Sequence, residues 1–130
     1  MGVAVLLDTH AFLWAVAQPE KLSRAARALL EDDTTAVVVS SATAWEIATK
    51  FRLGRFPDAN VLTPDYLGSL RKLQAQELPV SSRHVLRAGL FDVPHRDPFD
   101  RMLAAQALIE ALPLISKDPV FRDFEVSVIW

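Results

Sequence analysis

Two short hydrophobic runs in the first third of the chain predict strands. Val3 to Leu7 and Ala36 to Val39 contain no polar residue, and polar side chains follow each run directly. This pattern is typical of parallel strands that are buried on both faces of a sheet. Two weaker runs, Pro113 to Ser116 and Val126 to Ile129, predict a third and a fourth strand later in the chain.

Between these runs the hydrophobic residues recur with helical spacing. Ser23 precedes a run in which Ala26, Leu29 and Leu30 share one face, and its hydroxyl suits an N-cap. Other helices are predicted where a capping residue precedes a similar run and where glycine or proline marks a boundary. There are four of these helices. The first begins at Ser40 or Ser41 and ends near Leu53, before Gly54, and the second and third run from Pro64 to Leu73 and from Ser82 to Leu90. The fourth begins after the N-cap Asp97, with Pro98 at its first position, and extends to about Leu112.

Alternating strands and helices predict an α/β fold, arranged as a three-layer α/β/α sandwich around a mostly parallel central sheet. The chain has 130 residues, which is enough for one compact domain with a buried core and too few for two ordinary ones. There is no internal repeat, linker or low-complexity segment. We therefore expect residues 1–130 to form a single domain.

The composition limits the chemistry that is available. There is no cysteine, so a metal ion has to be held by oxygen or imidazole, and a disulfide or thiolate site is excluded. Hydrophobic residues make up 51% of the chain and charged residues 23%, which is the balance of a folded globular protein. The net charge of −2 does not favour a nucleic-acid binder, because most such domains have a clear basic excess.

The sequence predicts a soluble, cytoplasmic protein without a membrane partner. No stretch approaches the roughly 18 to 20 apolar residues that are needed to cross a bilayer. The first hydrophobic run is short, lacks a preceding basic region and ends at an aspartate, so it is a strand rather than a signal peptide.

Two aspartates lie directly after predicted strands. Asp8 follows the first strand, and Asp118 follows the third after one intervening residue. Functional groups gather at the carboxyl ends of the strands in an open α/β sheet, so both are candidate site residues. The alternative for each is a structural role, because aspartate is favoured at turns and N-caps.

Two further acids lie on predicted helices. Glu46 belongs to the helix after the second strand, where its alternative role is an exposed ion pair with Lys50 four residues later. Asp100 heads the apolar stripe of residues 103, 104, 107, 108 and 111, where a carboxylate is costly unless another group neutralises it. Asp97 has a sufficient structural role as the N-cap of the same helix.

If these four acids converge, their mutual repulsion requires protons or divalent cations nearby. Oxygen ligands without cysteine suit a hard ion such as Mg²⁺ or Mn²⁺, which keeps several waters and bridges to phosphate. Such an ion activates water for in-line attack on a phosphodiester. The acids therefore point to hydrolysis of a nucleic-acid backbone.

Three segments resemble the PIN-domain family, and in particular the VapC-type toxin ribonucleases of bacterial toxin–antitoxin pairs. VLLDTHAFLW resembles the first strand of the family with its leading acid, and VVSSATAWEIATKFRLGR resembles the second strand and the helix with the glutamate. HRDPFDRMLAAQALIEALPLISKDPVF resembles the third acid, the core helix, the next strand and the fourth acid. The segments follow the family's order and span nearly the whole chain.

The resemblance implies a PIN-like fold and a role for each matched residue. It implies that the protein is an endoribonuclease that uses Mg²⁺ or Mn²⁺ and metal-activated water. It also implies that the protein acts as a toxin, forms a homodimer and is inhibited by a cognate antitoxin. The implied catalytic and metal-binding residues are Asp8, Glu46, Asp100 and, as the more variable fourth member, Asp118. The implied supporting residues are Thr9, which would hold the first acid through its hydroxyl, Ser116, which stands where the family often has threonine, and Asp97.

The helix that carries Glu46 ends in basic residues. Lys50, Arg52 and Arg55 are our candidates for contacts to the RNA backbone. Their alternative role is a solvated helix end.

Several other interpretations are weaker. A non-catalytic PIN-fold module that binds RNA or protein would be favoured by loss of an acid, but all four are present. A phosphoacceptor receiver domain is disfavoured because the third acid lies inside a helix. The histidines lack the spacing of a zinc site. Trp14 and Trp45 are expected in the core or at an interface, rather than as platforms on which bases stack, because they lie in apolar helical patterns.

Overall fold

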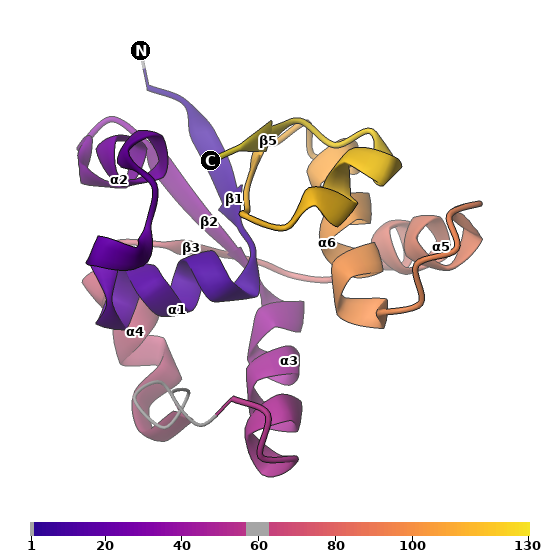
Figure 1. Cartoon of the computed structure of the whole chain (residues 1–130), viewed down its shortest axis with the longest axis horizontal. Coiled ribbons are helices and arrows are strands. Elements are labelled where there is room, and N and C mark those ends of the chain that lie inside the picture. The colour runs from indigo at the N-terminus through magenta and orange to yellow at the C-terminus, as the bar shows by residue number, and fades with distance from the viewer. Residues whose placement is uncertain (1, 57–62) are drawn as a thin grey trace.

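The computed structural model describes residues 2–56 and 63–130, and these residues contain one five-stranded sheet (Figure 1). All strand pairs are parallel, and the strand order is β3-β2-β1-β4-β5. The predicted α/β class and parallel sheet are confirmed. The strands are β1 (Ala4–Leu7), β2 (Ala36–Ser40), β3 (Gln76–Leu78), β4 (Leu114–Ile115) and β5 (Val128–Ile129).

Strand β1 lies at the centre of the sheet. Leu7 pairs in register with Val39 of β2 on one side and with Ile115 of β4 on the other. The chain moves outward from β1 to β2 and β3, then returns past β1 to β4 and β5, so the strand order reverses between β1 and β4. Parallel α/β sheets bind ligands beyond the carboxyl ends of the strands at such a point.

Helices cover both faces of the sheet, which gives the predicted three layers. Figure 1 shows α1, α2 and α4 on one side of the strands and α6 with α5 on the other. Helix α3 continues directly from β2 and contacts both α1 and α6. The helices are α1 (Thr9–Ala17), α2 (Arg24–Glu31), α3 (Ser41–Arg52), α4 (Tyr66–Lys72), α5 (Ser82–Leu90) and α6 (Pro98–Ile109), with 3-10 turns at Pro19–Lys21, Thr63–Asp65 and Pro119–Phe124.

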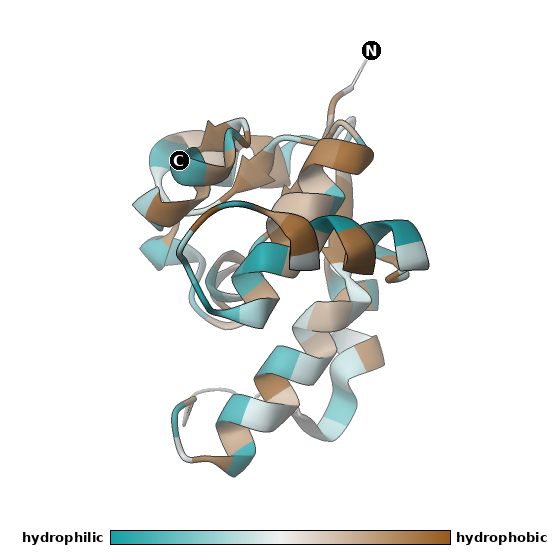
Figure 2. Ribbon diagram, turned by 90° about the vertical axis from the view of Figure 1, so that its right-hand side faces the viewer, coloured by the Kyte–Doolittle hydropathy of each residue, from teal (hydrophilic) through white to brown (hydrophobic). Residues whose placement is uncertain are grey.

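Alternate strand residues feed two hydrophobic cores. Val5 and Leu7 pack with α1, α2 and α4, whereas Leu6 and Val38 pack with α6 and the 3-10 turn after β4. This is the period-two alternation of a sheet that is buried on both faces. Figure 2 shows helices in which hydrophobic and hydrophilic residues interleave, as expected for helices that cover the faces of a sheet.

The structure confirms the two strong strand predictions and shortens the two weak ones. Ser23 caps α2, Ser40 caps α3, Asp97 caps α6, and the predicted bounds of α5 agree with the structure. The sequence interpretation did not include β3, a short edge strand whose residues are not hydrophobic enough to signal one. No helix in the described ranges is both long and apolar enough to span a bilayer.

Neither Trp14 nor Trp45 is fully buried in the core, which was one of the two positions expected for them. The side chain of Trp45 is 59% exposed and packs edge-on against Phe99, with ring centroids 4.7 Å apart. Trp14 is only partly buried against the core. The hydrophobic pattern of a helix does not indicate which of its apolar residues lie beyond the end of the sheet, where the helices no longer cover them.

Candidate active site

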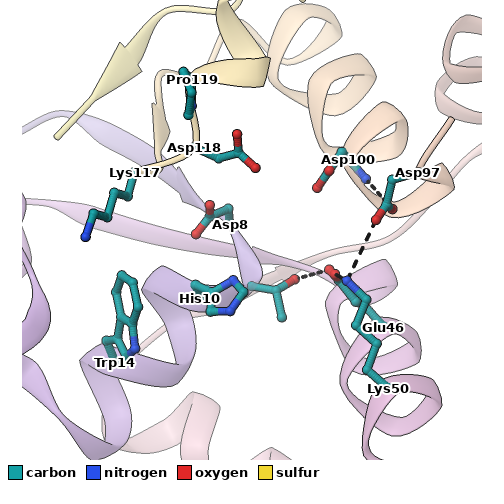
Figure 3. Close-up of a pocket in the computed structure, with 11 residues that line it drawn as sticks. Asp8, His10, Trp14, Glu46, Lys50, Asp97, Asp100, Lys117, Asp118 and Pro119 are labelled. Carbon is teal, nitrogen blue, oxygen red and sulfur yellow. Dashed lines mark hydrogen bonds and ion pairs between the residues drawn. The ribbon is translucent and has the colours of Figure 1, made fainter. Parts of the chain in front are cut away.

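A cavity of about 510 Å³ opens at the carboxyl ends of β1, β2 and β4 (Figure 3). It lies beside the point where the strand order reverses, as the parallel sheet predicts. All four predicted acids line it, together with the expected supporting residues Thr9 and Asp97. The lining residues are Asp8, Thr9, His10, Trp14, Glu46, Lys50, Asp97, Asp100, Lys117, Asp118 and Pro119.

Asp8 has both a structural and a candidate chemical role. One carboxylate oxygen caps α1 by accepting a hydrogen bond from the Ala11 amide at 2.8 Å, and the other accepts one from the Ser116 hydroxyl at 2.5 Å. The side chain is nonetheless buried beside other acids. Burial raises the pKa of Asp8 to about 6, the charges of Glu46 and Asp118 add to this rise, and the two hydrogen bonds oppose it.

Glu46 is 4% exposed and lies between two hydrogen-bond donors. The Thr9 hydroxyl donates to one carboxylate oxygen, and the Lys50 ammonium group lies 2.5 Å from the other. The expectation that Thr9 holds the first acid is therefore wrong, because the turn at the start of α1 directs its hydroxyl to Glu46 rather than Asp8. The predicted pair of Glu46 and Lys50 exists, but it is part of the cavity wall rather than an exposed surface.

Asp100 lies in the first turn of α6, and His95 lies 2.8 Å from one of its carboxylate oxygens. Burial raises the pKa of Asp100 to about 6, and the nearby charges of Asp97 and Glu46 raise it further, whereas His95 opposes the rise. Perturbed acids that share one cavity are typical of functional sites.

Asp97 has the predicted role of N-cap and a further position in the site. Its carboxylate accepts hydrogen bonds from the amides of Phe99 and Asp100. The other carboxylate oxygen lies 3.7 Å from the Lys50 ammonium group. Asp97 therefore fixes the start of α6 and faces the same cation as Glu46.

Asp118 is exposed at the rim of the cavity. It caps the 3-10 turn after β4 by accepting a hydrogen bond from the Val120 amide. Its own amide donates to the Ser116 hydroxyl at 3.0 Å, and the same hydroxyl donates to Asp8. The buried Ser116 side chain therefore links the first and fourth acids through one oxygen atom.

The four acids share the cavity without forming a tight cluster. Within residues 2–56 and 63–130, no three histidine, aspartate or glutamate side chains lie close enough together to hold a metal ion. Hydrogen bonds from Ser116, Thr9, Lys50 and His95 hold three of the carboxylates in place.

The donor set nevertheless fits a hard divalent cation. The cavity presents carboxylate oxygens and no sulfur ligand. Burial is the main cause of the raised pKa values of Asp8 and Asp100, and the charges of neighbouring acids add to it, so the charged carboxylates lack full compensation. A bound cation would provide that charge.

The predicted basic residues divide into two groups. Lys50 lines the cavity, where burial lowers its pKa but the Glu46 ion pair and the charges of Asp97 and Asp100 outweigh that effect and raise it above its ordinary value. Arg52 and Arg55 are exposed near the end of α3 and do not line the cavity.

Sequence reasoning did not assign His95, Arg101, Lys117 or Trp14 to the site. His95 contacts Asp100, and Arg101 donates hydrogen bonds to five backbone carbonyls of the segment that carries His95. Lys117 was visible as a cation beside Asp118, but no spacing rule marked the other three.

Comparisons with known proteins agree with this architecture. The model of the PIN domain family matches residues 5–126. A search of curated proteins finds no match. Similar solved structures include a chain of VapBC2 from Rickettsia felis bound to a promoter DNA fragment, with 12% identity, a TM-score of 0.68 and coverage of 98% of both chains.

Two further structures share the fold. A domain of a functionally unknown protein from Methanocaldococcus jannaschii has 12% identity and a TM-score of 0.59, with coverage of 98% of this chain and 90% of that one. A chain of FitAcB from Neisseria gonorrhoeae has 21% identity and a TM-score of 0.59, with coverage of 97% and 96%. At these identities the likeness concerns the fold.

Proposed function

The chain belongs to the PIN domain family, and on this premise we propose that it is an Mg²⁺- or Mn²⁺-dependent endoribonuclease that acts as the toxin of a toxin–antitoxin pair. The observation that carries the proposal is the convergence of Asp8, Glu46, Asp100 and Asp118 on one cavity. In two of them burial raises the pKa to about 6. These acids would act as the catalytic and metal-binding residues.

These carboxylates would hold a divalent ion, which would supply an activated water and stabilise the negative charge that develops on phosphate oxygens. The rest of the site positions the acids. Ser116 orients Asp8, Thr9 orients Glu46, and the Asp97 cap fixes the helical turn that carries Asp100. Because these contacts form within the protein itself, the acids are arranged before a substrate arrives.

Lys50 reduces the repulsion among the metal-free acids without removing it. Its ammonium group lies beside Glu46 and Asp97, in the place where positive charge is needed. We propose that it contacts the RNA backbone once a cation neutralises the acids, and that Arg52 and Arg55 extend this contact surface along the exposed end of α3.

The partners follow from the same family. The similarity to VapBC2 and FitAcB supports a cognate antitoxin as partner, and the acidic cavity suits an arginine or lysine that such a partner inserts. A homodimer and a cytoplasmic location complete the proposal.

The test is cleavage of RNA by the purified, partner-free protein. We would incubate total cellular RNA with the protein in Mg²⁺, Mn²⁺ or EDTA and map the cleaved ends. We expect discrete cuts that need the metal and vanish in Asp8→Asn and Asp100→Asn. Asp33→Asn, which changes an exposed acid outside the cavity, is the matched control and should retain the cuts.

Intact RNA under every condition, with a folded protein, would contradict the catalytic proposal. The alternative of a non-catalytic PIN-fold module that binds RNA or protein would then be preferred. Cuts that persist in both variants would instead indicate a contaminating nuclease.

A further inference from the structure

The cavity has two ends of different chemistry. Figure 3 shows Glu46, Lys50, Asp97 and Asp100 at one end, where α3 meets α6, and Trp14 and Lys117 at the other. Asp8 and Asp118 lie between them in this view. The four acids account for the proposed hydrolysis, whereas Trp14 and Lys117 have no role in it.

The aromatic end is a wall of packed rings. The Trp14 indole is partly buried yet lines the cavity, so part of its surface faces the open space. The centroid of the His10 ring lies 5.5 Å from that of the indole, and the centroid of the Trp130 ring lies 5.8 Å from it. His10 also packs edge-on against Phe56 at 5.0 Å. These contacts fix the indole in place before any ligand binds.

Lys117 differs from the other lysine of the cavity. Lys50 lies in ion pairs with Glu46 and Asp97, whereas the exposed Lys117 ammonium group has no ion pair with any residue that the structure describes. Lys117 lies between the buried Ser116 and the acid Asp118 in the chain. Its charge is therefore available to a ligand that enters beside the acids.

We propose that this end of the cavity is a nucleotide subsite, in which an unpaired RNA base stacks on Trp14 and a neighbouring phosphate binds Lys117. This inference rests on the proposed function, because it places that nucleotide beside the phosphodiester to be cleaved. A stack on a rigid indole and one cation are the elements with which proteins hold single-stranded nucleic acid. The base has to be unpaired, because a base inside an A-form helix does not present its face.

The charge of Lys117 favours the phosphate of a nucleotide over a cationic protein side chain at this end. A cationic side chain from an inhibitor would be repelled by Lys117 and would be attracted to the acidic end instead. The cavity volume of about 510 Å³ lies within the range of about 300–1,000 Å³ that is typical of small-molecule sites. The cavity as a whole is therefore large enough to hold a nucleotide.

The test compares two RNA probes that differ only in their bases. Fluorescein-labelled octaadenylate and an abasic octamer with the same ribose-phosphate backbone would be titrated with protein in Mg²⁺ and followed by fluorescence anisotropy. The protein carries Asp100→Asn, which disables the proposed hydrolysis at the opposite end of the cavity. Trp14→Leu should weaken octaadenylate binding about tenfold, the loss expected for one base–aromatic stack, and should leave abasic binding within twofold.

Two further variants separate the contribution of the base from that of the phosphate to RNA binding. Lys117→Gln should weaken both octamers by a similar factor and reduce the slope of log K against log salt by about 0.7, because it removes one phosphate contact. Trp45→Leu is the matched control, since this indole is exposed outside the cavity, and it should leave both affinities unchanged. If circular dichroism shows that Trp14→Leu does not fold, Trp14→Phe takes its place. This variant should weaken the binding of octaadenylate by a smaller factor and should leave the binding of the abasic octamer unchanged.

The inference stands only if substitution of Trp14 weakens the binding of octaadenylate more than the binding of the abasic octamer. If substitution of Trp14 weakens both octamers equally, or weakens neither, no base stacks on Trp14 and the wall serves protein packing or a protein partner. The nuclease proposal fails separately, when the unsubstituted protein leaves total RNA intact. Base-selective binding that depends on Trp14 would survive that result and would describe an RNA-binding module.

Discussion

The carboxyl group of Asp8 accepts two hydrogen bonds and still has a raised pKa. Hydrogen bonds to a carboxylate favour its charged form, so the pKa of about 6 means that burial and the neighbouring acids outweigh both bonds. The folded protein therefore binds a proton at Asp8 more tightly than the unfolded chain, whose pKa is near 3.8. The charged form of this side chain opposes folding in the absence of metal.

The sign of the resulting pH dependence follows from linkage. Above pH 6 the charged Asp8 lowers the free energy of unfolding, and the penalty disappears as the pH falls from about 6 through 3.8. Asp8→Asn should therefore stabilise the metal-free protein at pH 7.5 by about 1–3 kcal/mol, since one pKa unit corresponds to about 1.4 kcal/mol. It should also flatten the rise in stability between pH 7.5 and 5.

Urea unfolding at several pH values in EDTA measures this effect. Asp33→Asn is the control and should keep the steeper profile of the unsubstituted protein. If the stability of Asp8→Asn depends on pH as steeply as that of the unsubstituted protein, burial does not raise the pKa of the Asp8 carboxyl group.

Residue types and their order predicted the acids but not all of their partners. Asp8 and Asp118 were predictable because each follows a strand, and Asp100 because it heads an apolar stripe. The hydrogen bond from Thr9 to Glu46 was not predictable, because it depends on how α1 turns relative to α3. The same holds for His95, whose contact with Asp100 depends on a loop without periodicity.

At the scale of elements, the connection from α5 to α6 is organised by one side chain. The Arg101 guanidinium group donates hydrogen bonds of 2.7 to 3.4 Å to five backbone carbonyls between residues 88 and 95. One of these carbonyls belongs to His95, whose ring contacts Asp100. Arg101 is therefore a positioning residue that links the loop to the site.

Arg101→Lys should disrupt this loop although it keeps the charge. A lysine ammonium group presents three donors at one point and does not reach five carbonyls. We expect a loss of about 2–4 kcal/mol in stability, because part of the carbonyl set loses its partners. We also expect at least a tenfold fall in kcat, because His95 no longer holds Asp100.

Urea unfolding and RNA cleavage measure the two effects. Arg96→Lys changes an exposed arginine of the same loop and should alter neither. Full cleavage activity in a destabilised Arg101→Lys protein would show that the loop supports the fold without positioning Asp100.

Element prediction succeeded where local signals were strong. The helix start at Asp97 and Pro98 and the two buried runs of β1 and β2 were correct, since capping and continuous hydrophobicity are properties of neighbouring residues. Strand β3 exists through its pairing with β2, in which Gln76 is in register with Val38. A strand that is stabilised by its neighbour carries little signal in its own residues.

At the scale of the whole molecule, the sheet brings together acids that lie far apart in the chain. Parallel strands β1, β2 and β4 end at the same edge, so Asp8 and Asp118 meet across 110 positions of sequence. Their convergence follows from topology, but their exact spacing follows from side-chain partners. The sequence therefore predicted which acids line the cavity better than it predicted how those acids are arranged.

We expect the gathered acids to make the stability of the entire domain dependent on cations. A ligand that binds the folded state only stabilises it by RT ln(1 + [L]/Kd), which is about 2.7 kcal/mol at one hundred times Kd. Saturating Mg²⁺ or Mn²⁺ at pH 7.5 should therefore raise Tm by several degrees, since about 1 kcal/mol shifts the Tm of a domain of this size by about 2–8 °C. Differential scanning calorimetry with and without EDTA measures the shift.

Substitutions decide whether this shift originates in the cavity. Asp100→Asn removes one carboxylate of the proposed set and should abolish most of the metal-induced rise, whereas Asp33→Asn should keep it in full. A metal-induced rise of equal size in all three proteins would place the ions on the general surface, because screening of exposed charges does not distinguish one aspartate from another. A rise that depends on Asp100 in the absence of RNA would tie the cavity to metal binding without reference to catalysis.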